Sequence, residues 1–139
     1  ALSGALQTSP CATFTSDLKV CIDRRRMIAY PDVTVVCGQP DFLNSKCDVV
    51  KNPAVIVEVL SPSTEDYDRG KKATFYRMLP SLRDFLLVDQ DPVFVEHNRR
   101  LEDGTWQVIL HQDVDAVIRL QSVGVDLPVA TIYNKLEWY

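Results

Sequence analysis

Three side chains in this sequence have types and positions that suit chemistry: the carboxylates of Asp32 and Glu58 and the ammonium group of Lys72. Glu58 lies in the apolar run of residues 54–60, and alternation along a strand places its side chain on an apolar face. Burying an ionised carboxylate without a partner is costly, on the order of several kcal/mol. Glu58 must therefore be protonated, bound to a metal, or held in a structural ion pair.

Asp32 is the natural second acid, because it follows Pro31 at the start of a second predicted strand, residues 32–37. If the two strands are neighbours, their carboxylates converge. Two such charges about 4 Å apart repel by about 4 kcal/mol at an effective dielectric of about 20, so they raise a pKa or bind a cation. Oxygen ligands without Cys or His favour Mg²⁺ or Mn²⁺ over Zn²⁺. The alternative is an aspartate that caps a turn beside proline.

A predicted helix over residues 66–79 supplies a cation. Lys72 shares a helical stripe with the apolar and aromatic residues three, four and seven positions later, so we expect it to turn inward. Lys71 lies on a more mixed face. The alternative for Lys72 is an aliphatic stem along the core edge with its ammonium in water. Tyr76, on the same stripe, is expected to pack rather than to react.

The rest of the pattern predicts the elements that position these groups. Residues 54–60 are almost wholly apolar, which is typical of a central strand covered on both faces. Residues 93–97 and 106–110 flank a turn signal, which predicts an antiparallel meander. The mixed order of strands and helices indicates an α/β or α+β fold. The other expected elements are strands over residues 14–22, 32–37, 85–88 and 116–120, a loop over 39–52, and helical pieces at 1–7 and 129–133.

The length and composition suit one ordinary globular domain over residues 1–139. The formal charge of -4, from 15 basic and 19 acidic residues, argues against coating nucleic acid by bulk electrostatics but allows a local basic cleft. Two histidines and 5 glycines exclude a His-rich metal site and glycine-rich phosphate loops. Chemistry must therefore rest on carboxylates, lysine or cysteine.

The four cysteines, Cys11, Cys21, Cys37 and Cys47, form no CxxC pair, so metal binding by cysteine is not expected. Cys21 and Cys37 lie in apolar runs, where a thiol behaves as a small buried hydrophobe. Reduced thiols are therefore expected, with two disulfides as the alternative. No stretch has the roughly 18 to 20 apolar residues of a membrane span, and no leader pattern opens the sequence. We expect a cytoplasmic protein without a membrane partner.

The candidate residues belong to three motifs: Tyr30-Pro31-Asp32-Val33, VEVLSPST at residues 57–64, and DRGKK at residues 68–72 followed by Tyr76. With further motifs at residues 79–85, 103–106 and 124–128, the chain resembles the Uma-two family of restriction-endonuclease-like bacterial proteins, within the PD-(D/E)XK nuclease superfamily. The resemblance covers about residues 11–133. It implies a restriction-endonuclease-like core: a mixed β-sheet flanked by helices, with an antiparallel C-terminal meander and an N-terminal helix that is truncated here.

The resemblance also implies roles for individual residues. Asp32, Glu58 and the backbone carbonyl of Val59 would hold Mg²⁺ or Mn²⁺, and Lys72 would orient the attacking water or offset charge on the phosphorus. The sequence departs from the wider superfamily at Leu60, where the usual lysine is replaced and Lys72 on the helix takes its place. Substrate-binding candidates are Arg69, Lys71 and Tyr76.

The function implied is a metal-dependent DNA endonuclease that hydrolyses phosphodiesters. The alternative is a catalytically inactive nuclease-fold domain that binds DNA or protein or has a regulatory role, which Leu60 and the net negative charge favour. A third reading treats the acids and the lysine as a buried structural network. A duplex cutter needs two sites or two sequential nicks, so a homodimer is one expectation of the fold.

Overall fold

A computed structural model describes residues 10–15, 17–22, 27–43, 48–60, 65–90 and 92–136, with the backbone alone at residues 27, 65–68, 135 and 136. The expected helical piece at 1–7 and Cys47 lie outside the described residues, and so do residues 61–64 of the VEVLSPST motif. In chain order the elements are β1 (Cys11–Phe14), β2 (Lys19–Ile22), β3 (Met27–Ala29), β4 (Val33–Cys37), β5 (Val49–Val50), β6 (Val55–Val59), α2 (Glu65–Arg77), β7 (Asp84–Asp89), β8 (Phe94–Arg100), β9 (Trp106–His111), β10 (Val117–Leu120), a 3-10 helix η1 (Gln121–Val123), β11 (Val125–Pro128) and α3 (Val129–Leu136).

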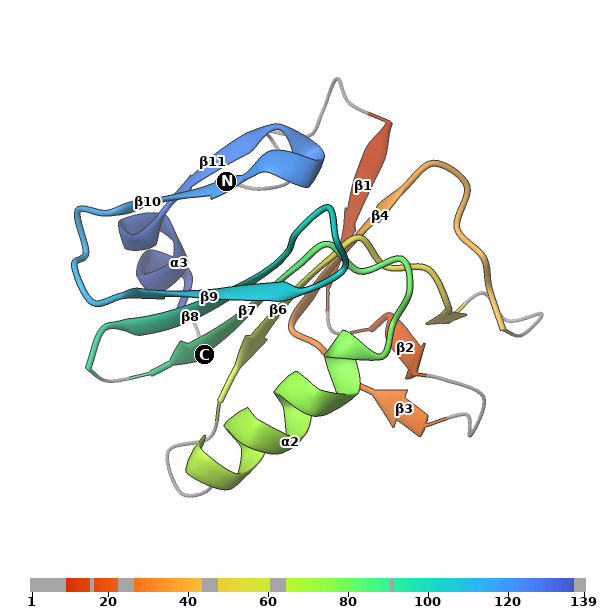
Figure 1. Ribbon diagram of the computed structural model, residues 1–139, viewed down its shortest axis with the longest axis horizontal. Coiled ribbons are helices and arrows are strands. Elements are labelled where there is room, and N and C mark those ends of the chain that lie inside the picture. The colour runs from red at the N-terminus through yellow and green to blue at the C-terminus, as the bar shows by residue number, and fades with distance from the viewer. Residues whose placement is uncertain are drawn as a thin grey trace.

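The main sheet has six strands in the order β1-β4-β6-β7-β8-β9 (Figure 1). β6 and β7 pair in parallel, while the other neighbours pair antiparallel, so the sheet is mixed. α2 is the crossover between the two parallel strands. The apolar runs of β6 and β7 fill the centre, where both faces are covered. This confirms the expected fold class, including the antiparallel β7-β8-β9 meander.

Two small sheets complete the fold. β2 pairs antiparallel with β3 and parallel with β5, and β10 and β11 form a hairpin. The single strand expected over residues 14–22 is wrong: a turn in which Leu18 N–H donates to the Thr15 carbonyl separates β1 from β2, which join different sheets. The alternation continued across the turn, so periodicity could not detect the break. β3, β5 and β11 are three short strands that the pattern did not predict.

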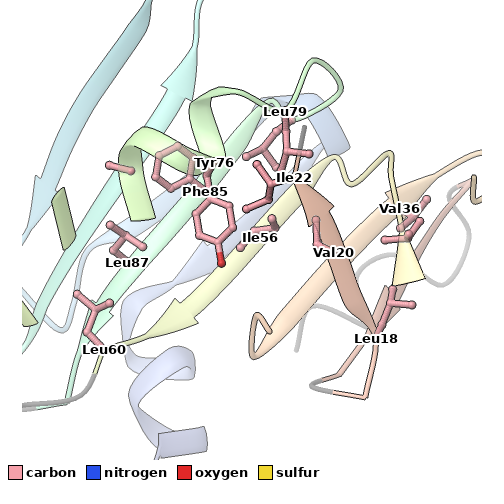
Figure 2. Close-up of a cluster of buried hydrophobic side chains, with 13 residues drawn as sticks. Leu18, Val20, Ile22, Val36, Ile56, Leu60, Tyr76, Leu79, Phe85 and Leu87 are labelled. Atoms are coloured by element: carbon pink, nitrogen blue, oxygen red, sulfur yellow. The ribbon is translucent and has the colours of Figure 1, made fainter. Parts of the chain in front are cut away.

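The main sheet is covered differently on its two faces. On one face, α2 packs over a cluster that includes Ile56, Leu60, Tyr76 and Phe85 (Figure 2). On the other face lie the β10–β11 hairpin and α3 (Figure 1). Their buried side chains form a second cluster with the alternate side chains of the same strands, and Val123 of η1 packs against it. Alternation along β6 therefore places Glu58 on the α2 face with Ile56.

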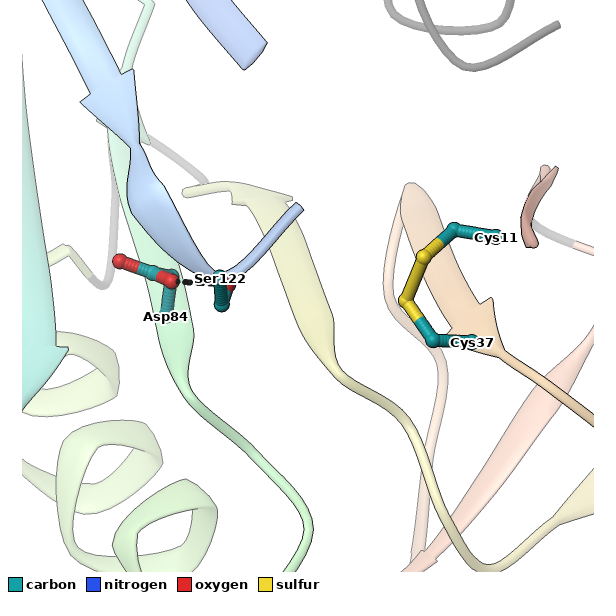
Figure 3. Close-up of a disulfide and its surroundings, with 4 residues drawn as sticks. All are labelled: Cys11, Cys37, Asp84 and Ser122. Carbon is teal, nitrogen blue, oxygen red and sulfur yellow. Dashed lines mark hydrogen bonds between the residues drawn. A yellow bond between two sulfur atoms is a disulfide. The ribbon is translucent and has the colours of Figure 1, made fainter. Parts of the chain in front are cut away.

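Cys11 and Cys37 form a disulfide between β1 and β4 (Figure 3). The expectation of reduced thiols is therefore wrong for this pair. The two cysteines are 26 residues apart in sequence but lie directly opposite each other in the antiparallel register, which spacing alone does not reveal. Cys21 is buried in β2.

Among the helices of the described residues, none has the length and apolar character needed to span a membrane. A single domain over residues 1–139 stays a prediction.

Candidate active site

Asp32 and Glu58 belong to neighbouring strand segments, which is the condition on which their predicted convergence depends. In the antiparallel register of β4 and β6, Val33 lies opposite Val57, so Asp32, one residue before β4, comes next to Glu58. The Asp32 Oδ2 atom accepts a hydrogen bond of 2.7 Å from the Val59 backbone N–H. This bond holds the aspartate carboxylate at the end of β6. Asp32 does not act as a simple turn cap.

Glu58 is buried, with 4% of the residue exposed, and both of its carboxylate oxygens have a partner on α2. Lys72 Nζ lies 2.5 Å from Oε1, and Tyr76 Oη donates to Oε2 at 2.8 Å. The inward direction of Lys72 is confirmed. Tyr76 was expected to pack, and the resemblance also made it a substrate-binding candidate; the structure places its hydroxyl on Glu58. Its place one helical turn after Lys72 was the available signal.

The charges in this group perturb one another. Burial raises the pKa of the Glu58 carboxyl; the Lys72 ammonium and the Tyr76 hydroxyl oppose that rise, and the Asp32 charge adds to it. Burial and the negative charges of Glu58 and Asp32 raise the pKa of the Tyr76 hydroxyl far above its usual range. Tyr76 is therefore a hydrogen-bond donor at neutral pH. Perturbed carboxylates of this kind occur at active sites and in structural ion-pair networks.

The three substrate-binding candidates lie in different surroundings. Arg69 forms ion pairs with Asp89 and Glu96 and its guanidinium lies 5.0 Å from the centre of the Phe94 ring. Its side chain is only 19% exposed, so in this structure the guanidinium is directed at β7 and β8. Lys71 is exposed on α2. Substrate contact by Arg69, Lys71 or Tyr76 stays a prediction.

The metal ligands that the resemblance implies are oxygens of Asp32, Glu58 and the Val59 carbonyl, and their binding of a metal stays a prediction. The part of the chain that the structure describes contains no group of three or more His, Cys, Asp and Glu residues that could hold a metal. Mg²⁺ is usually bound through one or two carboxylates, with waters and substrate phosphate oxygens completing its six ligands. Two converging carboxylates therefore suit Mg²⁺ or Mn²⁺, and the donor set does not suit zinc, which prefers N and S ligands.

Leu60, at the position where the resemblance leads to the expectation of a lysine, is 1% exposed and part of the core cluster under α2. The ammonium of Lys72 instead reaches Glu58 from the helix. The crossover helix therefore brings a cation to Glu58. That Lys72 takes the role of a catalytic lysine stays a prediction.

Sheet order, crossover helix and paired carboxylates define a chain with a restriction-endonuclease-like nuclease fold. The sequence profile of the family Uma2, described as "Putative restriction endonuclease", matches residues 1–130. The chain belongs to the Uma2 family.

Two Synechocystis proteins are related in sequence. The uncharacterised protein slr1290 is 37% identical over 133 residues, which cover 96% of this chain and 68% of the relative. The uncharacterised protein sll1609 is 39% identical over 93 residues, 67% of this chain and 52% of that protein, so the match spans about half of the second relative. These relatives support the family and assign no activity.

A solved structure shows the same fold. The crystal structure of "a putative nuclease belonging to DUF820" from Anabaena variabilis superposes with a TM-score of 0.74 at 15% sequence identity, covering 97% of this chain and 75% of that chain. Identity this low supports the fold alone.

Proposed function

We propose that this chain is a metal-dependent endonuclease that hydrolyses phosphodiester bonds in DNA. The observation that carries the proposal is the convergence of Asp32 and Glu58 from adjacent strands with Lys72 from α2, 2.5 Å from Glu58. Membership of Uma2 adds the expectation of a nucleic-acid substrate.

Asp32, Glu58 and the Val59 carbonyl would hold Mg²⁺ or Mn²⁺. When bound, such a metal polarises the scissile phosphate and lowers the pKa of an attacking water. The hydrogen bond from Val59 N–H fixes the Asp32 carboxylate, so one ligand is oriented before any substrate arrives. The burial of Glu58 removes competing water from its oxygens.

Lys72 links the buried carboxylate to the surface. Its side chain is 34% exposed, whereas that of Glu58 is 5% exposed, so the ammonium can reach a phosphate at the surface and stay near the site. There it would offset the negative charge that develops on the phosphate oxygens or orient the attacking water.

Binding of DNA by this chain would be local. A formal charge of -4 gives no general attraction to a polyanion, so affinity would come from the metal, from Lys72 and from cations such as Lys71. A homodimer and a cytoplasmic location stay predictions. The Cys11–Cys37 disulfide weighs against the cytoplasm, because disulfides are rare in that compartment.

A nicking assay tests the proposal. Purified full-length chain is incubated with supercoiled plasmid and with single-stranded DNA, each with Mg²⁺, Mn²⁺ or EDTA. We expect nicking with metal, none with EDTA, and loss of nicking in Asp32→Ala and Lys72→Met. Ser122→Ala is the matched control, because Ser122 bonds to Asp84 on the other face of the sheet. The proposal is wrong if the parent never cuts DNA with either metal, or if Asp32→Ala cuts as well as the parent.

A second candidate is a nuclease-fold domain that binds DNA or protein without cutting it. The Glu58–Lys72 ion pair favours it, because the charge of Glu58 is already compensated without a metal. Retained DNA binding in Asp32→Ala, together with an absence of nicking by the parent, would favour this candidate.

A further inference from the structure

The two oxygens of Glu58 have partners that differ in freedom. Oε1 faces the ammonium of Lys72, on a flexible side chain that is 34% exposed. Oε2 faces the hydroxyl of Tyr76, a residue only 1% exposed. A lysine ammonium is strongly hydrated and sits at the end of a flexible four-carbon chain, so it can move from the carboxylate into solvent at modest cost in free energy. A buried phenol has no such alternative.

The packing of Tyr76 fixes the direction of its hydroxyl. Its ring lies 5.6 Å from the ring of Phe85 on β7, in the cluster under α2 that also contains Ile56 and Leu60 (Figure 2). If the bond to Glu58 were lost, the hydroxyl would be left unpaired in this apolar cluster, which is unfavourable. Tyr76 and Oε2 therefore hold each other in place.

The charge balance favours exchange at Oε1. Asp32 and Glu58, when both are ionised, carry two negative charges, and Lys72 supplies one positive charge. A divalent cation compensates both carboxylates, which the ammonium alone does not. Lys72 and the cation compete for the same oxygen and repel each other, so both do not occupy it.

We propose that Tyr76 is a positioning residue whose hydroxyl stays hydrogen-bonded to Oε2 of Glu58 when a divalent cation binds. Lys72 is the exchangeable partner of Oε1, and the cation displaces its ammonium from that oxygen. This inference rests on the proposed function and adds a sequence of events to the site. Glu58 offers the cation a single oxygen in a fixed direction. The displaced Lys72 ammonium becomes available to the substrate when the cation arrives.

The test measures binding of Mn²⁺ to the full chain without DNA, with free Mn²⁺ counted by electron paramagnetic resonance. Lys72→Met removes the competing charge, so we expect Mn²⁺ to bind about five- to tenfold more tightly, although nicking falls. Tyr76→Phe keeps the ring and removes the hydroxyl. We expect about tenfold weaker binding, the usual effect of losing a group that orients a metal ligand.

Ile118→Val is the matched control for general destabilisation. Ile118 is fully buried on β10, on the other face of the sheet, and the change removes one methylene from its packing. It should lower the melting temperature and leave the Mn²⁺ dissociation constant unchanged. A merely structural role for Tyr76 would make Tyr76→Phe behave like this control.

The outcomes separate this inference from the proposed function. The inference is overturned if Lys72→Met binds Mn²⁺ no more tightly than the parent, or if Tyr76→Phe binds it equally well. If the parent binds no Mn²⁺, both the inference and the metal-dependent function are wrong. If the variants shift as expected but the parent never cuts DNA, the inference stands and the nuclease proposal fails.

Discussion

Glu58 and Asp84 are two buried carboxylates on the neighbouring parallel strands β6 and β7, and they differ in what surrounds them. Each has two side-chain partners: Lys72 and Tyr76 for Glu58, and His97 and Ser122 for Asp84. Figure 3 shows the bond between Ser122 and Asp84. Asp84 is on the face covered by η1, the β10–β11 hairpin and α3. Its His97 partner is 2% exposed, as buried as the carboxylate itself.

The cationic partner of Glu58 is instead 34% exposed, and a second carboxylate, Asp32, lies beside the pair. The difference teaches that burial of an acid does not by itself mark a site. Asp84 ties η1 to the sheet through Ser122, and among the described residues its side-chain hydrogen-bond partners are a histidine and a serine. Glu58 has a neighbouring acid and a cationic partner whose side chain is partly exposed.

The largest expected effect is on nuclease activity. Glu58→Gln should lower DNA nicking by about a thousandfold or more, the scale on which removing one member of a catalytic unit acts. Asp84→Asn, measured on the folded fraction, should stay within about threefold of the parent, since ordinary positions away from the reacting groups change rates little. Initial nicking rates in Mn²⁺ check both variants. Equal losses in the two variants would erase the distinction between the two carboxylates.

Removing the disulfide should destabilise the protein by about 3 kcal/mol, because a cross-link over 26 residues restricts the unfolded chain. Both cysteines pack against the core cluster on the Asp84 face, away from Glu58. Denaturant unfolding of Cys11→Ser/Cys37→Ser measures the loss. Mn²⁺ binding by the folded double variant should match the parent. A parent whose stability does not respond to reductant would contradict this expectation.

Asp84→Asn should reduce the free energy of unfolding by about 2 kcal/mol, because the amide keeps one acceptor oxygen for two partners, so the hydrogen bond from His97 or that from Ser122 is lost or reversed, and the charge of the acceptor is removed. Ser122→Ala, which removes one hydrogen bond at an exposed residue, should reduce it by about 1 kcal/mol. Urea unfolding measures both changes. A stabilised Asp84→Asn would show that the network is not a structural tie.

The smallest effect is a pH dependence. The pKa of Glu58 is raised above 4.5 in the folded state, so between 4.5 and that higher pKa the folded protein binds the proton more tightly than the unfolded chain. Its contribution to stability is therefore fully present below about pH 4.5 and is lost as pH rises through the folded pKa. Glu58→Gln has no titrating group at this position, so it does not lose this stability as the pH rises.

The stability of Glu58→Gln minus that of the parent should therefore increase from about pH 4.5 towards neutrality, in buffer containing EDTA. Urea unfolding at a series of pH values measures this difference, with Ile118→Val as a variant that should show no such trend. A difference that shrinks with rising pH would mean that Lys72 and Tyr76 outweigh the burial of Glu58.

Much of the fold could be predicted because it follows local patterns. The apolar run around Glu58 located β6 within one residue at each end, and the helix expected over 66–79 is α2, Glu65–Arg77. The short strands were missed because two to four residues carry too little periodicity to distinguish them from loops. β5, with two residues, exists because β2 offers it a parallel edge.

The candidate site was predictable in part for the same reason. Strand alternation predicted that Glu58 lies on an apolar face, and helical spacing predicted that Lys72 points inward. Spacing did not show that the Tyr76 hydroxyl would end on Oε2 of Glu58, nor that Arg69 would pair with Asp89 and Glu96. Both contacts depend on where α2 crosses the sheet, and that position is set by packing between distant segments.

The sequence by itself determined which residues could carry chemistry. Its few histidines and glycines excluded histidine-rich metal sites and glycine-rich phosphate loops, and its patterning pointed to an acid in an apolar strand and an inward lysine on the following helix. Only the tertiary structure decided which of these groups meet. The β4–β6 register brought Asp32 to Glu58 across 26 residues of chain, and the same β4 strand brought Cys37 to Cys11. The physical reason is that periodicity records which face a side chain occupies, whereas register and crossing position depend on the packing of the whole core.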